Sequence, residues 1–399
     1  MQRPLELARV ADERLNRLCA PNAVNVRPWP RVLPPHRNQL FIGIDDVWND
    51  VAMTTRAPLV VACDESGNDG ENLLVGSSPV FAHASVTISA DAAAEIMAGV
   101  RAQTRSQSVE LKSKTILQPK QEATARWLLE HPLLTEAVSV HLTHKRYLVV
   151  SKLFDSTVEE LARNDGYDMY ADGSALAAAN ILFFLAPSAY GTTWDDLLLS
   201  FQQFLRAKTP TDAASSLTTL QAAFAAVLSH ESPLGDFVSM AFAGIAHLGS
   251  LSDLQLGQGI DHRLRTLDPL IPAVGATVLF WAEKENAPVE LVHDAASELT
   301  PERINAIKHY LARPEIVSPQ RAGRGVALTN LALVDSQHDV RVQVADLVAG
   351  LARAAGEQLT MGKEHPLFTA IEPIISQYSI WPAERLMNPE EARAVATRA

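Results

Sequence analysis

The sequence predicts an α/β protein in which a mixed sheet flanked by helices carries a large helical insertion. Short apolar runs such as 59–63 and 289–293 are bounded by turn residues, which is typical of buried strands. Stretches with apolar residues at helical spacing, such as 91–104, lie between such runs. The centre, 155–287, is rich in Ala and Leu, and its patterns indicate helices separated by prolines.

In chain order, a helical start and a proline-rich stretch precede the first strand. Ser89 or Asp91 is expected to cap the helix that follows the first strands, and Thr300 with Pro301 to open a later one. The expected strands are 59–63, 73–76, 80–88, 137–142, 289–293 and 326–334. The expected helices are 91–104, 120–130, 174–186, 194–207, 214–230, 234–249, 269–284, 300–312 and 341–357. The predicted units are an N-terminal extension (1–57), the sheet domain's first part (58–154), the helical insertion (155–287), and the sheet domain's second part with C-terminal helices (288–399).

Composition places the chain among globular proteins, since 47% of its 399 residues are hydrophobic and 20% are charged. It has two cysteines, Cys19 and Cys63, so no disulfide framework is expected and a reducing cytoplasm is the simpler setting. The N-terminus carries charges throughout, unlike a signal peptide. Since no apolar run is long enough to span a bilayer, we expect no membrane association.

The net charge of −12 argues against a general polyanion binder. Most of this charge lies in 155–287, where six Lys and Arg stand against sixteen Asp and Glu, a balance of −10. The rest of the chain is close to neutral, which allows a local nucleic-acid surface. The acidic helical insertion favours a protein partner.

Several carboxylates stand where a fold would hold them rigidly. Asp64 ends the first apolar strand, and Asp294 and Asp335 end later ones. Asp346 lies in a helix that is apolar on almost all sides, where a lone charge is costly unless it is paired or bound to metal. Glu110 follows a helix and precedes a segment rich in Lys and Ser. Such oxygen ligands suit Mg²⁺ or Mn²⁺.

Each of these carboxylates also has a simpler reading. Asp64 could be a solvated turn residue of a hairpin, and Glu110 a surface charge. Asp346 could pair with Arg341 or Arg353 at the edge of its helix. Only their combination favours a site, because two cations held by such a set can cleave a phosphodiester bond.

The sequence resembles the domain-of-unknown-function 3800 family in four motifs: DESG (64–67), ELKS (110–113), VDS (334–336) and QVADLVAG (343–350). Members of this family are similar to ribonuclease H-like nucleases and resolvases. The resemblance covers 58–150 and 288–358. It implies a ribonuclease H-like fold with Asp64, Glu110 and Asp346 as metal ligands, and Lys112 as a point charge on the scissile phosphate. The strand 137–142, counted as the fourth, lacks the carboxylate that ribonuclease H carries there, so either Asp294 or Asp335 would substitute.

We therefore expect a metal-dependent nuclease that hydrolyses phosphodiester bonds of DNA or RNA with Mg²⁺ or Mn²⁺. The alternative is a non-catalytic module of the same fold that binds nucleic acid or protein.

Overall fold

The fold is described from a computed structural model, which places residues 56–106, 108, 111–245, 248, 267–313 and 326–398. Nearly all of the predicted N-terminal extension, 1–55, lies outside the described residues.

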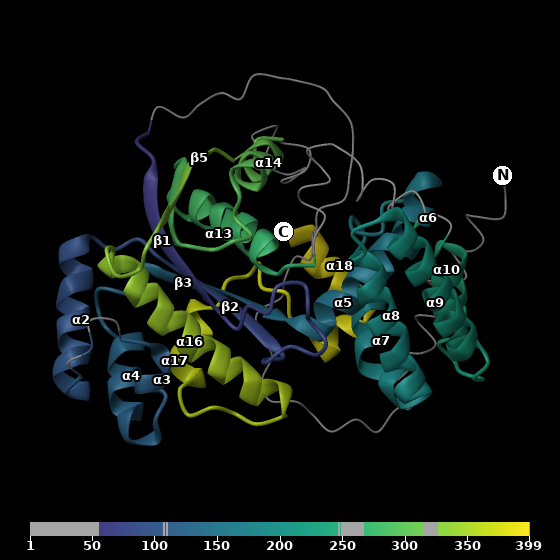
Figure 1. Ribbon diagram of the computed structural model, residues 1–399, viewed down its shortest axis with the longest axis horizontal. Helices are drawn as coiled ribbons and strands as arrows, with labels where there is room; N and C mark the ends of the chain where they lie inside the picture. Colours follow the sequence, from purple (N-terminus) through teal and green to yellow (C-terminus); the bar gives the residue numbers. More distant parts are fainter. Residues whose placement is uncertain are drawn as a thin grey trace.

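Five strands form one mixed sheet in the order β3-β2-β1-β4-β5 (Figure 1). The central strand β1 pairs antiparallel with β2 and parallel with β4. β3 continues antiparallel from β2, and β5 continues parallel from β4. Because β1 and β4 run in the same direction, their carboxyl ends meet at one edge of the sheet. The strands are β1 (Leu59–Ser66), β2 (Val80–Val86), β3 (Val138–His144), β4 (Val289–Asp294) and β5 (Leu328–Val334).

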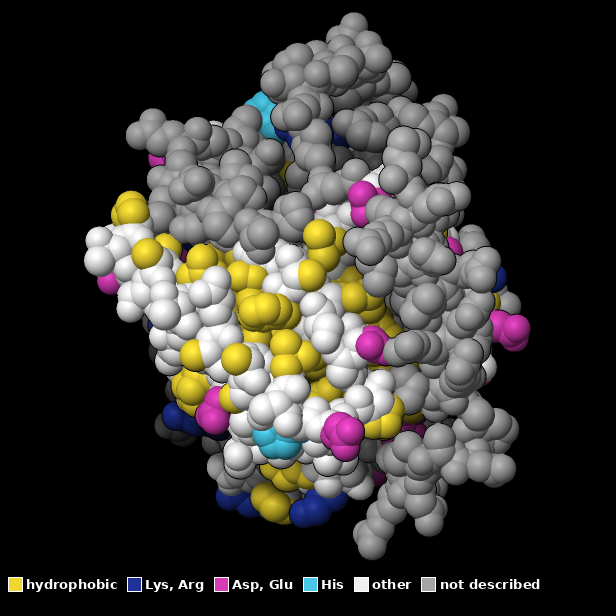
Figure 2. Space-filling model, turned by 90° about the vertical axis from the view of Figure 1, so that its right-hand side faces the viewer, with side chains coloured by type: hydrophobic (Ala, Val, Ile, Leu, Met, Phe, Trp, Pro, Cys, Tyr) yellow, Lys and Arg dark blue, Asp and Glu magenta, His cyan; other side chains and the backbone are white. Residues whose placement is uncertain are grey.

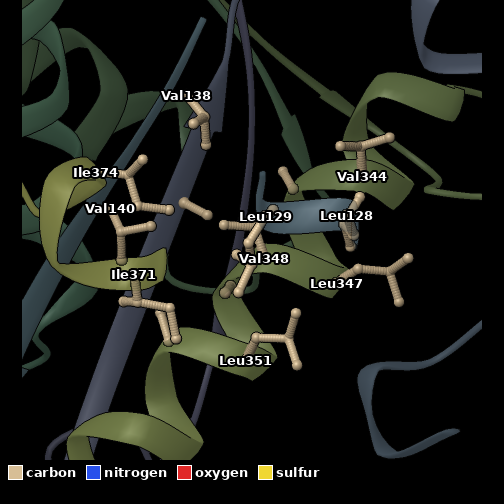
Figure 3. Packing of buried hydrophobic residues seen from close by; sticks show 14 of the residues in the cluster. Leu128, Leu129, Val138, Val140, Val344, Leu347, Val348, Leu351, Ile371 and Ile374 are labelled. Atoms are coloured by element: carbon tan, nitrogen blue, oxygen red, sulfur yellow. The ribbon is translucent and has the colours of Figure 1, made fainter. Parts of the chain in front are cut away.

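One face of the sheet is covered by α16, the predicted late helix, together with four shorter helices. α16 is apolar nearly all round because it is packed between the sheet and these outer helices. Figure 3 shows Val344, Val348 and Leu351 of α16 in the same cluster as Leu129 of α4 and Val140 of β3. The helices on this face are α2 (Ala90–Thr104), α3 (Ser113–Ile116), α4 (Glu122–Leu129), α16 (Val340–Thr360) and α17 (Phe368–Ile371). Ser89 caps α2 as predicted, accepting a hydrogen bond from the amide of Ala92.

The opposite face of the sheet is covered by α13 (Leu270–Glu285) and α14 (Pro301–Leu311). Thr300 caps α14 as predicted. The sequence assigned α13 to the helical insertion, but this helix packs on the sheet. Its Trp281 donates a hydrogen bond to the hydroxyl of Ser85 on β2 over 2.8 Å. Among the described residues, 155–287 contributes no strand to the sheet.

A second group of helices lies beside the sheet and has a core of its own (Figure 1). β3 leads directly into its first member, α5. Figure 2 faces this side of the molecule, and the acidic side chains visible there are scattered among apolar and uncharged ones. The members are α5 (Lys145–Phe154), the π-helical turn Asp155–Glu159, α6 (Glu160–Asn164), α7 (Ser174–Tyr190), α8 (Thr192–Leu205), α9 (Pro210–Leu228) and α10 (Gly235–Ala243). The C-terminal helix α18 (Pro389–Arg398) packs on α7.

In the described part of the chain, no helix has both the length and the apolar character that crossing a membrane requires.

The predicted strand 73–76 is wrong, because this stretch is an irregular loop. The backbone amides of Leu73 and Leu74 donate to the side-chain oxygen of Gln202 on α8 at 2.9 and 3.1 Å, so they have no strand partner. Leu73 is buried in the core of the helical group. The loop after β1 therefore connects the sheet to the helices instead of extending the sheet.

Candidate metal centre

The ends of β1 and β4 carry two of the predicted carboxylates. Ala62 pairs with Val292, and Cys63 with His293, so Asp64 and Asp294 are the next residues along these parallel strands. Alternation places both aspartates on the face of the sheet that α16 covers. Asp64 is buried, with 5% of its surface exposed, and Asp294 is half-buried.

Asp346 reaches the same region from α16, which packs across β1 and β2. Its side chain is 14% exposed, and the ammonium of Lys112 lies 3.8 Å from its Oδ2. The sequence allowed Asp346 to pair with Arg341 or Arg353. In the structure these arginines form ion pairs with Asp339 and Glu357. Two residues predicted to act together, Lys112 and Asp346, are thus neighbours.

Burial, together with repulsion among carboxylates, is the main electrostatic feature of this region. Burial, and then the charges of Asp346, Glu65 and Asp294, raise the pKa of Asp64 from 3.8 to about 9. Burial and the charge of Asp294 likewise raise the pKa of Glu65 to about 7. Asp294 on β4 and Asp346 on α16 are therefore close enough to Asp64 and Glu65 on β1 to oppose the ionisation of those two carboxyl groups. We call Asp64, Glu65, Asp294 and Asp346 the carboxylate cluster.

Glu65 is the member that the sequence did not single out. It follows Asp64 on β1, so alternation turns it toward the opposite face of the sheet, where it pairs in register with His83. Its Oε2 is buried without a hydrogen-bond partner. In the sequence, the only indication of a role for Glu65 is its position next to Asp64 in DESG. Neighbouring side chains of a strand point to opposite faces, which argued against a shared site.

The nearby histidines do not neutralise Glu65. Nδ1 of His293 lies 2.8 Å from the carbonyl oxygen of Asp294, which can only accept, so this nitrogen carries the proton. Nε2 of neutral His293 then accepts from Nε2 of His83, 3.1 Å away. Burial lowers the pKa of both rings. Nε2 of His293 therefore lies 3.6 Å from Glu65 without offering it a positive charge.

The remaining predicted ligands are placed differently. Glu110 lies outside the described residues. Asp335 follows β5, which is separated from β1 by β4, and its side chain is 57% exposed beside His338.

The donor chemistry of the cluster fits a hard divalent cation, because Asp64, Asp294 and Asp346 offer only carboxylate oxygens. In the described ranges, no three His, Cys, Asp or Glu side chains are already grouped as they would be around a metal ion. Repulsion among the cluster's own charges acts against such a grouping. The residues present would hold a cation by drawing together around it.

No protein-family model matches the chain, and no curated protein or solved structure is significantly similar to it.

Gly350 of α16 explains how the segment carrying Lys112 reaches the cluster. A Cβ atom at Gly350 would lie 2.1 Å from both Cβ and Oγ of Ser113, but 3.6 Å from its Cα. The absence of a side chain at Gly350 therefore lets the start of α3 lie directly against α16. Lys112, which precedes α3, is held near Asp346 by this contact.

We expect Gly350→Ala to destabilise the protein by about 1–3 kcal/mol, because the added methyl group overlaps Ser113. Urea denaturation would measure the change. Ser113→Gly should recover most of the loss in the double variant, since only the Ser113 side chain is in the way. Gly235→Ala is the matched control, because nothing lies within 4 Å of a Cβ there. Equal stability of the two alanine variants would contradict the close contact.

Proposed function

We propose that the protein is a divalent-cation-dependent nuclease built on a ribonuclease H-like sheet. The observation that carries this proposal is the carboxylate cluster, in which three elements bring four carboxylates to the carboxyl ends of two adjacent parallel strands. Such a set is expensive to maintain unless a cation neutralises it. Lys112, half-exposed beside Asp346, adds a positive charge at the rim of the cluster.

The strand order supports the fold assignment. Three antiparallel strands followed by two parallel ones, with β1 in the centre, is the arrangement expected of a ribonuclease H-like sheet. The strand that lacked a carboxylate, 137–142, is β3, which lies two strands from β1. The sequence makes it the fourth strand only because the sequence also predicts a strand at 73–76, which is a loop. The strand that lies parallel beside β1 is β4, and it ends at Asp294, so we assign the missing carboxylate to Asp294 and not to Asp335.

Each residue of the cluster has a role in this proposal. Asp64, Asp294 and Asp346 would hold Mg²⁺ or Mn²⁺, with Glu65 and Glu110 as further candidates. Cations bound there supply an activated water and stabilise the leaving oxygen of a phosphodiester. Lys112 would contact a phosphate oxygen as a point charge. The substrate is then DNA or RNA, and the buried free thiol of Cys63 suits the expected cytoplasmic setting.

The test is cleavage of labelled single- and double-stranded DNA and RNA with Mn²⁺, Mg²⁺ or EDTA. We expect metal-dependent cleavage that falls at least about 100-fold in Asp64→Asn and stays near wild type in Asp335→Asn. Equal cleavage by the wild type and Asp64→Asn would contradict the proposal. Metal-dependent binding without cleavage would instead favour the non-catalytic binding module.

The affinity for Mn²⁺ should increase with pH, because ligands must release their protons before they bind metal. The raised pKa values of Asp64 and Glu65, about 9 and about 7, place this competition near neutrality. Each proton displaced adds up to about tenfold in affinity per pH unit. Calorimetric titration at pH 6.5 and 8 should give at least a tenfold difference. An affinity that does not change between these pH values would contradict protonated ligands.

A further inference from the structure

Gln343 is the first residue of the QVADLVAG motif and lies one helical turn before Asp346. It is not a member of the carboxylate cluster. It is buried, with 6% of its surface exposed. A buried amide must satisfy both its oxygen and its nitrogen, so its partners show what it holds in place.

The partners of Gln343 fix its amide in one orientation. A guanidinium nitrogen of Arg101, on α2, donates to Oε1 over 3.2 Å. Nε2 donates to the carbonyl oxygen of Ser336 over 2.9 Å. Arginine can only donate and a carbonyl oxygen can only accept, so a flipped amide would lose both hydrogen bonds. Gln343 thus joins α2 to the turn between β5 and α16.

The turn held by Gln343 contacts the cluster directly. The backbone amide of Ser336 donates to Oδ1 of Asp294 over 2.9 Å. Ser336 is buried, whereas its neighbours Asp335 and Gln337 are exposed. The hydrogen bonds therefore run without interruption from Arg101 through Gln343 and Ser336 to the Asp294 carboxylate.

We infer that Gln343 is a positioning residue that orients Asp294 within the carboxylate cluster by holding Ser336. The effect of Gln343 on metal affinity rests on the proposed function, whereas its effect on the position of Ser336 does not. The hydrogen bond to one oxygen of Asp294 leaves the other for a cation, and outer groups that orient a ligand typically contribute about 10–100-fold to metal affinity. VDS and QVADLVAG then act together, because each supplies one side of the same turn.

Gln343→Met tests the inference, because it keeps the length of the side chain and removes both hydrogen bonds. The first measurement is hydrogen exchange of the Ser336 amide in EDTA. We expect exchange to become at least tenfold faster in Gln343→Met. Gln358→Met, on the same helix but away from the turn, is the control and should leave this amide unchanged. Unchanged exchange in Gln343→Met would overturn the inference whether or not the protein binds metal.

The second measurement is Mn²⁺ affinity in a double-mutant cycle with Asp294→Asn. Gln343→Met should weaken binding about tenfold in the wild-type background and by less than twofold in the Asp294→Asn background. Equal weakening in both backgrounds would overturn positioning through Asp294 and indicate a general structural role. If the wild type binds no Mn²⁺, the proposed function fails, and the exchange of the Ser336 amide alone decides whether Gln343 holds the turn.

Discussion

Replacing Asp64 by Asn is expected to stabilise the metal-free protein and to abolish most of its response to Mn²⁺. The substitution keeps the shape of the side chain and removes one of four mutually repelling carboxylates. The same change removes a charged ligand, so Mn²⁺ at about 100 times its dissociation constant, which should stabilise the wild type by about 2.7 kcal/mol, should stabilise the variant much less. Thermal melts with EDTA and with Mn²⁺ measure both effects.

The pH dependence of the stability of the metal-free protein shows why Asp64→Asn is expected to stabilise it. The pKa of Asp64 is about 9 in the folded protein and near 3.8 in an unfolded chain. Between these values the folded state holds a proton that the unfolded state has released, so stability falls as pH rises through this window. Asp64→Asn removes this dependence. The difference in stability between the variant and the wild type in EDTA should therefore increase from pH 5 to pH 8, with the variant the more stable.

Asp335→Asn is the matched control, because it neutralises an exposed aspartate after β5 and should alter neither melt. A structural Asp64 would behave in the opposite way. Losing a paired carboxylate would lower stability by about 1–3 kcal/mol in EDTA, and Mn²⁺ would then stabilise variant and wild type equally. That pattern would contradict the metal centre.

The largest loss of stability is expected from Asp69→Asn, in the loop that follows β1. The side chain of Lys145, at the start of α5, is fully buried, and its ammonium forms an ion pair with Asp69. Ser77 adds two hydrogen bonds to the same carboxylate, at 2.8 and 3.0 Å. Burial alone would raise the pKa of Asp69, but the hydrogen bonds from Lys145 and Ser77 outweigh it and lower that pKa to about 2.

Removing the charge of Asp69 leaves Lys145 buried and unneutralised, which should cost about 3–5 kcal/mol in urea denaturation. The neighbouring exposed pair Arg146–Asp195 is the control, and Asp195→Asn should cost less than about 1 kcal/mol. Combining Asp69→Asn with Lys145→Met should recover much of the loss, because it removes both charges. Similar costs for the two asparagine variants would show that burial of Lys145 is unimportant.

The sequence predicted the elements whose patterns are local. Apolar runs ending at Asp64 and Asp294 are strands, and the caps at Ser89 and Thr300 begin helices as expected, because strand burial and capping depend on neighbouring residues. The stretch 73–76 has the composition of a strand but lies in a loop. Its partner, Gln202, is far away in sequence, and no local pattern indicates such a contact.

The candidate site was predictable only in part, because some of its contacts join residues that are far apart in the sequence. Asp64 and Asp346 were singled out because each is a carboxylate in apolar surroundings, and Lys112 because of the family resemblance. The choice between Asp294 and Asp335 depends on which strand lies beside β1, and this is a property of the whole sheet. The roles of Glu65 and Gln343 depend on contacts across strands and turns that spacing along the chain does not reveal.

Calorimetric titration of the full chain with Mn²⁺ at pH 8 tests the metal centre most directly, when repeated on Asp346→Asn and Asp335→Asn. The cluster predicts saturable binding of about one or two ions by the wild type and by Asp335→Asn. Binding should be weakened at least about tenfold in Asp346→Asn. An absence of saturable binding by the wild type, or equal affinity in the wild type and Asp346→Asn, would contradict it.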